Sequence, residues 1–324
     1  MDSKKMKKIR ALVLFSGGLD STLAVKVLEK QNIDVTGLAF VSYFFDDAKA
    51  KISADKNNIK MHSVDFSWMH CEMVKRPKRG YGSAMNPCID CHLLMIREAG
   101  RIMCKEGFDF VATGEVLGQR PMSQNMRALK LIEKEAGLEG RLLRPLSAKL
   151  LEETSVEKEG LVDREKLLDI SGRSRKRQFE LVKELAINYY PTPSGGCLLT
   201  EIEFGKRLKK LWEEVEDPAF SDYELLKLGR HFWVDGAHII IGRNERENIK
   251  LKELKGKSDI MIELEDLMGP AALVRNHDSR TVEEAKKLIA GYSRHAKNKN
   301  YHQLEYKISR DNFTTVLQHI VAKK

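Results

Sequence analysis

Glycine, hydroxyl and carboxylate residues gather in one short segment, residues 15–22, which has the sequence Phe-Ser-Gly-Gly-Leu-Asp-Ser-Thr. Its two glycines let the backbone turn tightly and bring N–H groups close to an anion. A helix that begins at this turn adds unpaired N–H groups and partial positive charge. We therefore expect a phosphate-binding loop rather than an ordinary capped helix, with the aspartate available to Mg²⁺. The residues expected to contact the phosphates or their metal ion are Ser16, Gly17, Gly18, Asp20, Ser21 and Thr22.

Three of the five cysteines have a spacing that suits sulfur or metal chemistry. Cys88 and Cys91 form a C-x-x-C pair where a helix opens, and Cys197 follows two glycines far downstream. In one interpretation Cys91 and Cys197 transfer sulfur as persulfide and resolving thiol, and the helix N-terminus lowers the pKa of Cys91. In the other, which we favour, all three ligate a [4Fe–4S] cluster whose fourth iron stays open to sulfide; a zinc ion that also uses His92 is a third option. The cysteines without such context, expected to pack in the core, are Cys71 and Cys104.

These residues must be positioned by a regular alternation of apolar strands and helices, which predicts a parallel sheet with helices on both faces. The expected strands are 11–15, 35–43, 60–65 and 108–113, and the expected helices are 21–30, 49–57 and 91–107. The pattern breaks at Asp217 and Pro218, so we expect an α/β domain over residues 1–215 and a second domain over 216–324. The second domain is expected to be a small α+β fold, with strands at 238–242, 260–264 and 271–275 and a helix at 282–295.

The net charge of +9 favours a polyanionic partner such as RNA. Basic runs at 75–81 and 172–178 precede the cysteine segments, which supports RNA contact near them, although two solvated turns would need no partner. No apolar stretch approaches the roughly eighteen residues of a membrane helix. The basic N-terminus has no small-residue cleavage site. We therefore expect a cytoplasmic protein without membrane contact.

The loop at 15–22 is similar to the PP-loop of the N-type ATP pyrophosphatases, which cleave ATP between the α- and β-phosphates. It lacks the Gly-Lys-Ser/Thr of a Walker loop. The resemblance implies the PP-loop fold, which is like that of the adenine nucleotide alpha hydrolases, with ATP and Mg²⁺ as ligands. It also implies that backbone groups near Phe40, at the end of the second strand, hold adenine.

A second segment narrows the family. Residues 112–119, Ala-Thr-Gly-Glu-Val-Leu-Gly-Gln, precede Ser123 and Gln124 and resemble the Gly-Glu-x-Leu-Gly-Gln…Ser-Gln segment of the 4-thiouridine synthases that modify transfer RNA. Because the segment lies where a strand ends and a helix begins, it should face the same cleft as the first loop. Gly114 and Gln119 are therefore expected to belong to the nucleotide site. The cysteine spacing likewise resembles cluster-dependent tRNA thiolases, in which three cysteines without a fourth ligand are typical.

The most specific string of the second domain is Ile-Gly-Arg-Asn-Glu-Arg-Glu-Asn at 241–248. It resembles the Val-Gly-Arg-Asn…Glu-Asn motif of the NFACT-R domain, an RNA-binding module of ribosome quality-control proteins, and the likeness covers roughly residues 225–300. This chain departs from that domain at 259–264, where Asp-Ile-Met-Ile-Glu-Leu replaces Asp-Leu-Trp-Phe-His-Ala. Any function of that Trp and His is therefore in doubt here.

Together these features predict an ATP-dependent tRNA sulfurtransferase of the 4-thiouridine synthase and 2-thiouridylase superfamily. A uridine carbonyl is adenylated, and sulfur from sulfide or a persulfide-donating carrier then replaces its oxygen. The expected catalytic residues are Asp20, Cys91 and Cys197. The expected partner is tRNA, and a homodimer is compatible with the sequence. Two alternatives remain: a PP-loop amide ligase or sulfur-transfer enzyme for a small molecule, and a non-catalytic RNA- or ribosome-binding factor.

Overall fold

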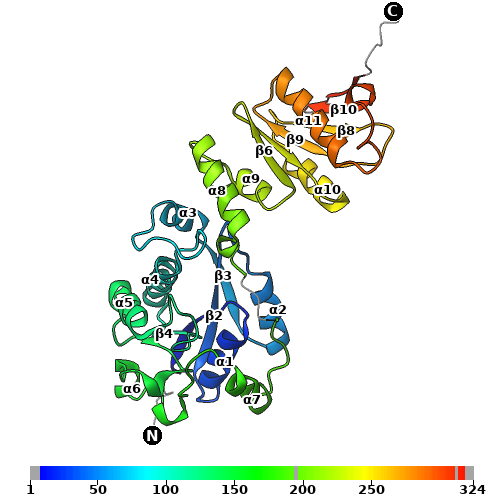
Figure 1. Ribbon diagram of the computed structural model, residues 1–324. Coiled ribbons are helices and arrows are strands. Elements are labelled where there is room, and N and C mark those ends of the chain that lie inside the picture. Colours follow the sequence, from blue (N-terminus) through cyan, green and yellow to red (C-terminus); the bar gives the residue numbers. More distant parts are fainter. Residues whose placement is uncertain (1–7, 193–195, 311–312, 318–324) are drawn as a thin grey trace, which may run out of the picture. The chain divides into compact units, whose positions relative to one another are not determined.

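The structure, a computed structural model, describes residues 8–192, 196–310 and 313–317. It divides into two compact units, Met1–Ile202 and Glu203–Lys324, which the sequence colours of Figure 1 distinguish. Helix α8 (Ile202–Glu214) begins at the division. The domain boundary that we expect between residues 215 and 216 stays a prediction. Within the described ranges, no helix has both the length and the apolar character that crossing a bilayer requires.

The first unit is built on a five-stranded parallel sheet with the order β3-β2-β1-β4-β5. The strands are β1 (Arg10–Leu14), β2 (Asp34–Val41), β3 (Met61–Asp65), β4 (Phe110–Thr113) and β5 (Leu142–Leu143). The chain winds outward from β1 to β2 and β3, then crosses back to β4 on the other side of β1. The carboxyl ends of β1 and β4 therefore form a topological switch point, where open α/β sheets bind their ligands.

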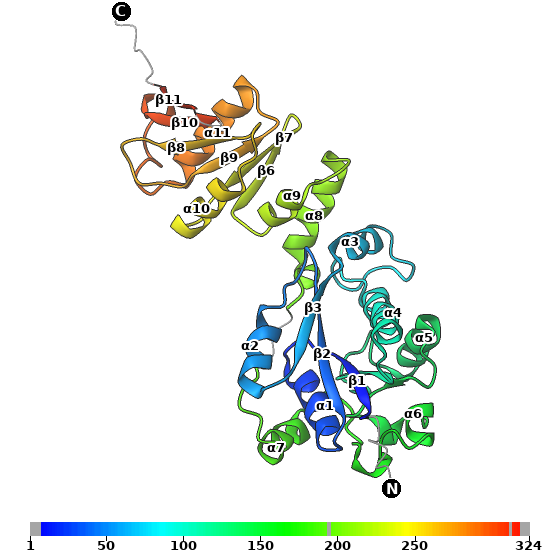
Figure 2. The ribbon, with the colours of Figure 1, turned by 180° about the vertical axis from the view of Figure 1, so that it is seen from behind.

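Helices cover both faces of this sheet, as the sequence predicts (Figures 1 and 2). Alternate residues of β1 serve the two faces, so Val13 packs in one core and Leu12 in the other. The first core contains α1 (Leu19–Glu29), α2 (Ala48–Asn57) and α7 (Lys176–Glu184). The second contains α4 (Cys88–Glu106) and α5 (Met126–Ala136), and α3 (Ser67–Lys75) packs on α4. The short elements are α6 (Ser155–Lys158) and 3₁₀ turns at Ala148–Leu150, Arg164–Lys166 and Leu198–Thr200.

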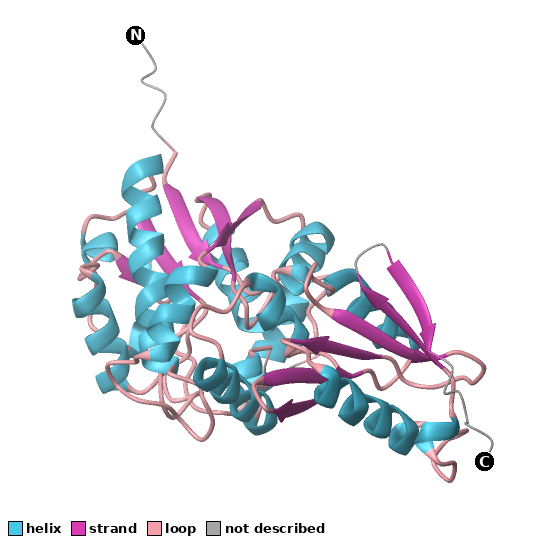
Figure 3. Cartoon of the chain, turned by 90° about the horizontal axis from the view of Figure 1, so that it is seen from above, coloured by secondary structure: helices cyan, strands magenta, loops and turns pink. Residues whose placement is uncertain are grey.

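The second unit is a six-stranded antiparallel sheet with the order β11-β10-β8-β9-β7-β6 and with helices packed on it (Figure 3). Helix α11 (Ser279–Tyr292) packs on one face, and α9 (Phe220–Leu225) and α10 (Glu245–Leu254) pack on the other. The expected α+β fold is thus confirmed. The strands are β6 (Arg230–Val234), β7 (Ala237–Ile241), β8 (Ile260–Leu264), β9 (Ala272–Arg275), β10 (Tyr306–Arg310) and β11 (Phe313–Leu317), and a 3₁₀ turn spans Tyr301–Gln303.

The string at 241–248 forms the turn from β7 into α10, and its polar side chains hold that turn together. The Asn244 side chain caps α10 by accepting a hydrogen bond from the Glu247 amide at 3.0 Å. Asn248 Oδ1 accepts one from the Ala271 amide at 3.1 Å. A Cβ added at Gly242 would lie 2.1 Å from Asn248 Oδ1. Asn244 and Asn248 therefore stabilise the turn, and this role does not depend on contact with RNA.

Replacing the cap of this turn should cost stability. We expect Asn244→Ala to lower the free energy of unfolding of the second unit by about 1 kcal/mol, because a backbone N–H of α10 loses its partner. Hydrogen exchange of the α10 amides in urea measures this. Asn244→Asp, which keeps an acceptor at the same place, is the control. Equal protection in Asn244→Ala and the unsubstituted chain would show that the cap contributes nothing.

Candidate active site

The expected phosphate loop connects β1 to α1 at the switch point of the sheet. Gly18 precedes α1 in extended conformation, and its carbonyl accepts hydrogen bonds from Ser21 Oγ and Thr22 Oγ1, each at 3.0 Å. Gly17 has a φ of +73°, and a Cβ added there would lie 2.5 Å from the carbonyl oxygen of Lys49. A side chain at this position would therefore displace the loop. The loop conformation is thus held by the Ser21 and Thr22 hydroxyls and depends on the missing side chain of Gly17.

Asp20 is the acidic residue of the loop, and its two carboxylate oxygens have different surroundings. Oδ2 accepts a hydrogen bond from Gln119 Nε2 at 2.7 Å and lies 3.9 Å from the Arg175 guanidinium. Oδ1 is buried and has no hydrogen-bond partner within the described residues. A buried carboxylate oxygen without a partner is costly, and a divalent cation would satisfy it. The carboxylate therefore fits a magnesium ligand.

The segment at 114–119 lies against the phosphate loop, at the carboxyl end of β4. A Cβ added at Gly114 would lie 2.6 Å from both the carbonyl carbon of Asp20 and the amide nitrogen of Ser21. Two backbones can approach this closely only because Gly114 has no side chain. From the other end of the segment, Gln119 reaches the Asp20 carboxylate, and Gln119 Oε1 in turn accepts a hydrogen bond from Gln178 Nε2 at 3.1 Å.

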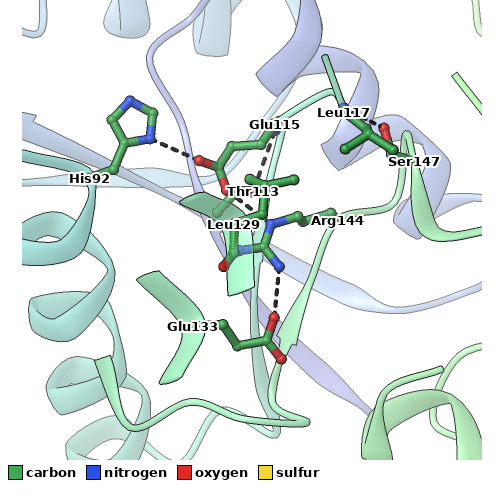
Figure 4. Close-up of polar contacts among 8 residues, drawn as sticks. All are labelled: His92, Thr113, Glu115, Leu117, Leu129, Glu133, Arg144 and Ser147. Atoms are coloured by element: carbon green, nitrogen blue, oxygen red, sulfur yellow. Dashed lines mark hydrogen bonds and ion pairs between the residues drawn. The ribbon is translucent and has the colours of Figure 1, made fainter. Parts of the chain in front are cut away.

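Glu115 lies at the centre of a buried ionic network (Figure 4). Its Oε1 shares a hydrogen bond with His92 Nδ1 at 2.8 Å, and its Oε2 accepts from Arg144 Nε at 3.1 Å and from Thr113 Oγ1 at 3.1 Å. Arg144 also donates to Glu133 Oε2 at 2.8 Å. Burial alone would raise the pKa of Glu115, but the hydrogen bond with His92 and the charge of Arg144 outweigh it and lower the pKa to about 2. Glu115 is therefore a carboxylate at neutral pH.

The same segment connects the phosphate loop to the cysteine helix. Gln119 contacts Asp20 in the loop, while Glu115 contacts His92 in the first turns of α4, one residue after Cys91. Leu117 between them donates its amide to Ser147 Oγ at 2.9 Å, which fixes the middle of the segment (Figure 4). One short segment thus contacts both the phosphate loop and the cysteine helix.

The three cysteines of interest lie close enough to affect one another. Cys88 and Cys91 occupy the first turn of α4, and an amide-to-carbonyl bond of 3.1 Å from Leu198 to Phe44 anchors the segment after Cys197. Burial raises the pKa of Cys91 well above its usual value, and the nearby Cys197 and Cys88 raise it further. Burial likewise raises the pKa of Cys197 to about 11, with Cys88 contributing. The three thiols are free, and residues 193–195, just before Cys197, lie outside the described residues.

Two expectations about the cysteines are wrong. The helix N-terminus predicts a lowered pKa for Cys91, but burial and the neighbouring thiols dominate and raise it. Cys104, expected in the core, is exposed, because the buried stripe of α4 runs through Ile96, Ala99 and Met103 and leaves the next position outside. Cys71 is buried, as expected. In the described part of the chain, no three His, Cys, Asp or Glu side chains already have a metal-binding arrangement.

His70 is a site residue that the sequence did not indicate. It comes from α3 and is fully buried, with its Nε2 3.0 Å from Cys91 Sγ and its Nδ1 2.6 Å from Ser42 Oγ. Burial lowers the pKa of His70 to about 4, so the imidazole is neutral at physiological pH. No motif spacing links positions 42, 70 and 91. Helix α3 places His70 between Ser42, which follows β2, and Cys91 of α4.

Phe40 and the two basic runs are the remaining features that the sequence assigns to the site. Phe40 is buried in the second core, where its ring lies 4.8 Å from that of Phe66, so only its backbone is available to a nucleotide. In the first basic run, the Arg79 guanidinium is held by Asp90 and Glu135. In the second, Arg175 faces the phosphate loop. The basic runs are therefore partly committed to contacts within the chain.

Two family models match separate parts of the chain. Residues 7–159 match the family model of the thiamine biosynthesis protein ThiI, and residues 229–324 match that of the NFACT protein RNA binding domain. A tRNA sulfurtransferase of Desulfurococcus amylolyticus is 29% identical over 146 residues, which are 42% of this chain and 29% of the relative. A tRNA-specific 2-thiouridylase MnmA of Sulfurimonas denitrificans is 31% identical over 118 residues, 33% of this chain and 35% of the relative.

Among solved structures, a 4-thiouridine synthetase–RNA complex with bound ATP is 22% identical with a TM-score of 0.39, covering 63% of this chain and 52% of that one. The chain spans about a third of the length of the sulfurtransferase and the 2-thiouridylase. Residues 7–159 are thus similar to the ThiI family, and residues 229–324 are similar to the RNA-binding domain of NFACT proteins.

Proposed function

We propose that this protein is an ATP-dependent sulfurtransferase that converts a uridine of tRNA to a thiouridine. The observation that carries the proposal is the double contact of segment 114–119, which touches the phosphate loop through Gln119 and the cysteine helix through Glu115. An enzyme that activates a base with ATP and then delivers sulfur needs those two sites side by side. The relatives named tRNA sulfurtransferase and tRNA-specific 2-thiouridylase support the same reaction.

In this proposal ATP binds at the switch point of the first sheet. The phosphate loop, residues Ser16–Thr22, holds the phosphates, and the unpartnered Asp20 Oδ1 ligates Mg²⁺. Backbone groups near Phe40 hold the adenine, and Gly114 lets the second segment close on the loop. Arg175 is the basic side chain placed to offset the charge that develops on the leaving pyrophosphate.

The reaction then has two substitutions. The carbonyl oxygen of the uridine attacks the α-phosphorus, a P–O bond forms, and the bond to the β-phosphate breaks with release of pyrophosphate. Sulfide next attacks the activated ring carbon, a C–S bond forms, and the C–O bond breaks with release of AMP. No atom is oxidised or reduced in either step if the donor delivers sulfide. The target base must leave its stack to reach the site.

For the sulfur site we propose Cys88, Cys91 and Cys197 as ligands of a [4Fe–4S] cluster. Burial and the neighbouring thiols raise the pKa of Cys91 and of Cys197, so these two are poor free thiolates, and cationic iron would offset both effects. Asn86 Nδ2 donates to Cys88 Sγ at 3.2 Å, a contact suited to a sulfur that carries negative charge. When bound, the cluster would supply an iron site for incoming sulfide. A Cys91/Cys197 persulfide pair is the alternative donor.

The second unit supports the RNA part of the proposal. Its family model describes an RNA-binding domain. At the edge of its sheet, the exposed Tyr292 ring lies 4.6 Å from the Arg230 guanidinium, a pair suited to stacking on a base beside the backbone phosphates. Cytoplasmic location, a sulfur carrier as donor and assembly as a homodimer remain part of the same proposal.

The decisive experiment separates tRNA thiolation from small-molecule chemistry. Anaerobically purified protein is incubated with ATP, Mg²⁺ and sulfide, with or without tRNA, and pyrophosphate and thiouridine are measured. We expect pyrophosphate release to require tRNA and thiouridine to accumulate with it. Release without tRNA would favour a small-molecule ligase, and no release at all would favour a non-catalytic binding factor.

The cysteine variants test the sulfur site in the same preparation. We expect iron and acid-labile sulfide in the unsubstituted chain and their loss in Cys88→Ala, Cys91→Ala and Cys197→Ala, because three ligands leave none to spare. Cys104→Ala, an exposed cysteine on the same helix as the first two, is the matched control and should keep its iron. Iron-free protein that still thiolates tRNA would contradict the cluster and favour the persulfide pair.

A further inference from the structure

His70 makes a buried contact with a cysteine of the proposed sulfur site that no motif accounts for. Its Nε2 lies 3.0 Å from Cys91 Sγ, and its Nδ1 lies 2.6 Å from Ser42 Oγ. The ring is stacked on Phe66 at 4.8 Å with an interplanar angle of 5°. Phe44 and Phe45 contact the ring at 5.5 and 5.4 Å between centroids. The imidazole is therefore clamped by aromatic rings, with only its two nitrogens engaged in polar contacts.

The surrounding hydrogen bonds assign the proton of this imidazole. The Phe44 amide donates to Ser42 Oγ at 3.3 Å, so that oxygen already accepts one hydrogen bond. The hydroxyl proton of Ser42 must then go to His70 Nδ1, since within the described residues the buried serine has no other acceptor at hydrogen-bond distance. A neutral imidazole that accepts at Nδ1 carries its proton on Nε2. That proton points at the sulfur of Cys91.

The opposite tautomer fits the contacts less well. If Nδ1 carried the proton, Ser42 Oγ would accept two hydrogen bonds and its own proton would be buried without an acceptor. An unsatisfied buried donor costs about 1–3 kcal/mol. The three hydrogen bonds therefore have one consistent donor direction: the Phe44 amide donates to Ser42 Oγ, Ser42 Oγ to His70 Nδ1, and His70 Nε2 to Cys91 Sγ.

We propose that His70 is a positioning residue that donates its Nε2–H to Cys91 Sγ and so holds this sulfur, with Ser42 fixing the tautomer. The inference rests on the proposed sulfur site and extends it to α3. A metal-bound thiolate keeps lone pairs that accept hydrogen bonds, and outer contacts of this kind orient the ligand and stabilise the bound metal. Because Ser42 and the Phe66 ring fix the histidine, the donor is in place before any metal binds.

The tautomer is tested directly on the full chain. With ¹⁵N-labelled histidine, protonated and unprotonated ring nitrogens have separate NMR shifts, and the His70 signals are those missing from His70→Gln among the nine histidines. We expect the Nε2–H tautomer in the unsubstituted protein and a mixture in Ser42→Ala. Ser42→Thr, which keeps the hydroxyl, should restore the single tautomer. An Nδ1–H tautomer in the unsubstituted protein would overturn the inference.

A second measurement asks whether the contact holds the metal. Anaerobically reconstituted protein is challenged with a chelator and iron loss is followed. We expect His70→Leu to bind iron about 10- to 100-fold more weakly. Ser42→Ala, in which part of His70 keeps the Nε2–H tautomer, should be weakened less. His70→Gln should recover much of the affinity, because the glutamine amide reaches the place of Nε2, which a purely space-filling role would not predict. His62→Leu, at a half-buried histidine on β3, is the matched control and should be unchanged.

The two measurements distinguish failure of the proposed cluster from failure of the proposed role of His70. If the unsubstituted protein takes up no iron, the proposed cluster is wrong, while the tautomer of His70 still decides whether the hydrogen bond to Cys91 exists. If iron binds normally and His70→Leu keeps it as firmly as His62→Leu does, the cluster stands and the positioning role of His70 is wrong.

Discussion

Gly114→Ala is expected to lower tRNA-dependent pyrophosphate release by about 100-fold with little loss of stability outside the site. The added methyl group would lie 2.6 Å from backbone atoms of Asp20 and Ser21, where no flexible side chain can move away. The phosphate loop and the segment at 114–119 must therefore separate by roughly 1 Å. A displacement of that size between reacting groups costs on the order of 100-fold in rate. Steady-state pyrophosphate release at saturating ATP and tRNA measures the effect.

The control for this substitution is Gly160→Ala. Gly160 has a φ of +72° and open space where its Cβ would stand, so the substitution costs roughly 1 kcal/mol of backbone strain without touching the site. We expect its pyrophosphate release to match that of the unsubstituted chain. If Gly114→Ala releases pyrophosphate as fast as Gly160→Ala does, the close approach of the two segments has no part in the reaction.

Much of the first unit could be predicted because its signals are local. The run that forms β1 is apolar on both faces, as a central parallel strand requires, and the glycine turn after it marks the start of α1. The segment at 112–119 could be placed at the same cleft because parallel strands end at one edge of the sheet. The contact between Gly114 and the backbone of Asp20 bears out that placement.

What could not be predicted depends on packing between distant elements. Helix α5 is an exception, because its local signals are clear and the expected helices omit it: Asn125 caps its start, Leu129 and Ile132 lie at helical spacing, and Gly137 follows its end. His70 lies beside Cys91 because α3 packs on α4. The spacing of residues 70 and 91 in the sequence does not indicate this contact. The expected pKa of Cys91 is wrong because the helix terminus is visible in the sequence, whereas burial is not.

The second unit contains one further local signal in its sequence. Asp235 and Gly236 both have positive φ, 48° and 79°, and form the two-residue turn between β6 and β7. An Asp-Gly pair between apolar segments is among the strongest sequence signals for such a hairpin. This pair therefore locates β6, the strand that carries Arg230 beside Tyr292 and that the expected strands omit. The string at 241–248 has a family resemblance, and the structure adds that its asparagines hold a turn.

Glu115→Gln is expected to destabilise the first unit by about 3 kcal/mol. The substitution removes the negative charge between His92 and Arg144 and leaves a guanidinium whose side chain is 3% exposed with only Glu133 to balance it. Breaking a buried ion pair by removing one partner costs about 3–5 kcal/mol. Hydrogen exchange of the β4 amides in urea measures the loss. Adding Arg144→Met should recover part of it, since an apolar replacement of the whole pair is often neutral.

The Glu115 carboxylate should also make the free energy of unfolding of the first unit depend on pH in the acid range. Its pKa is held at about 2, below the ordinary 4.5, so the folded state binds the proton less readily than the unfolded state. The stabilisation is therefore fully present above pH 4.5 and is lost as the pH falls from there toward 2. The amount is on the order of 3 kcal/mol. We expect the unsubstituted unit to lose stability more steeply than Glu115→Gln over this window, and parallel curves would mean that Glu115 is not held as a carboxylate by Arg144 and His92.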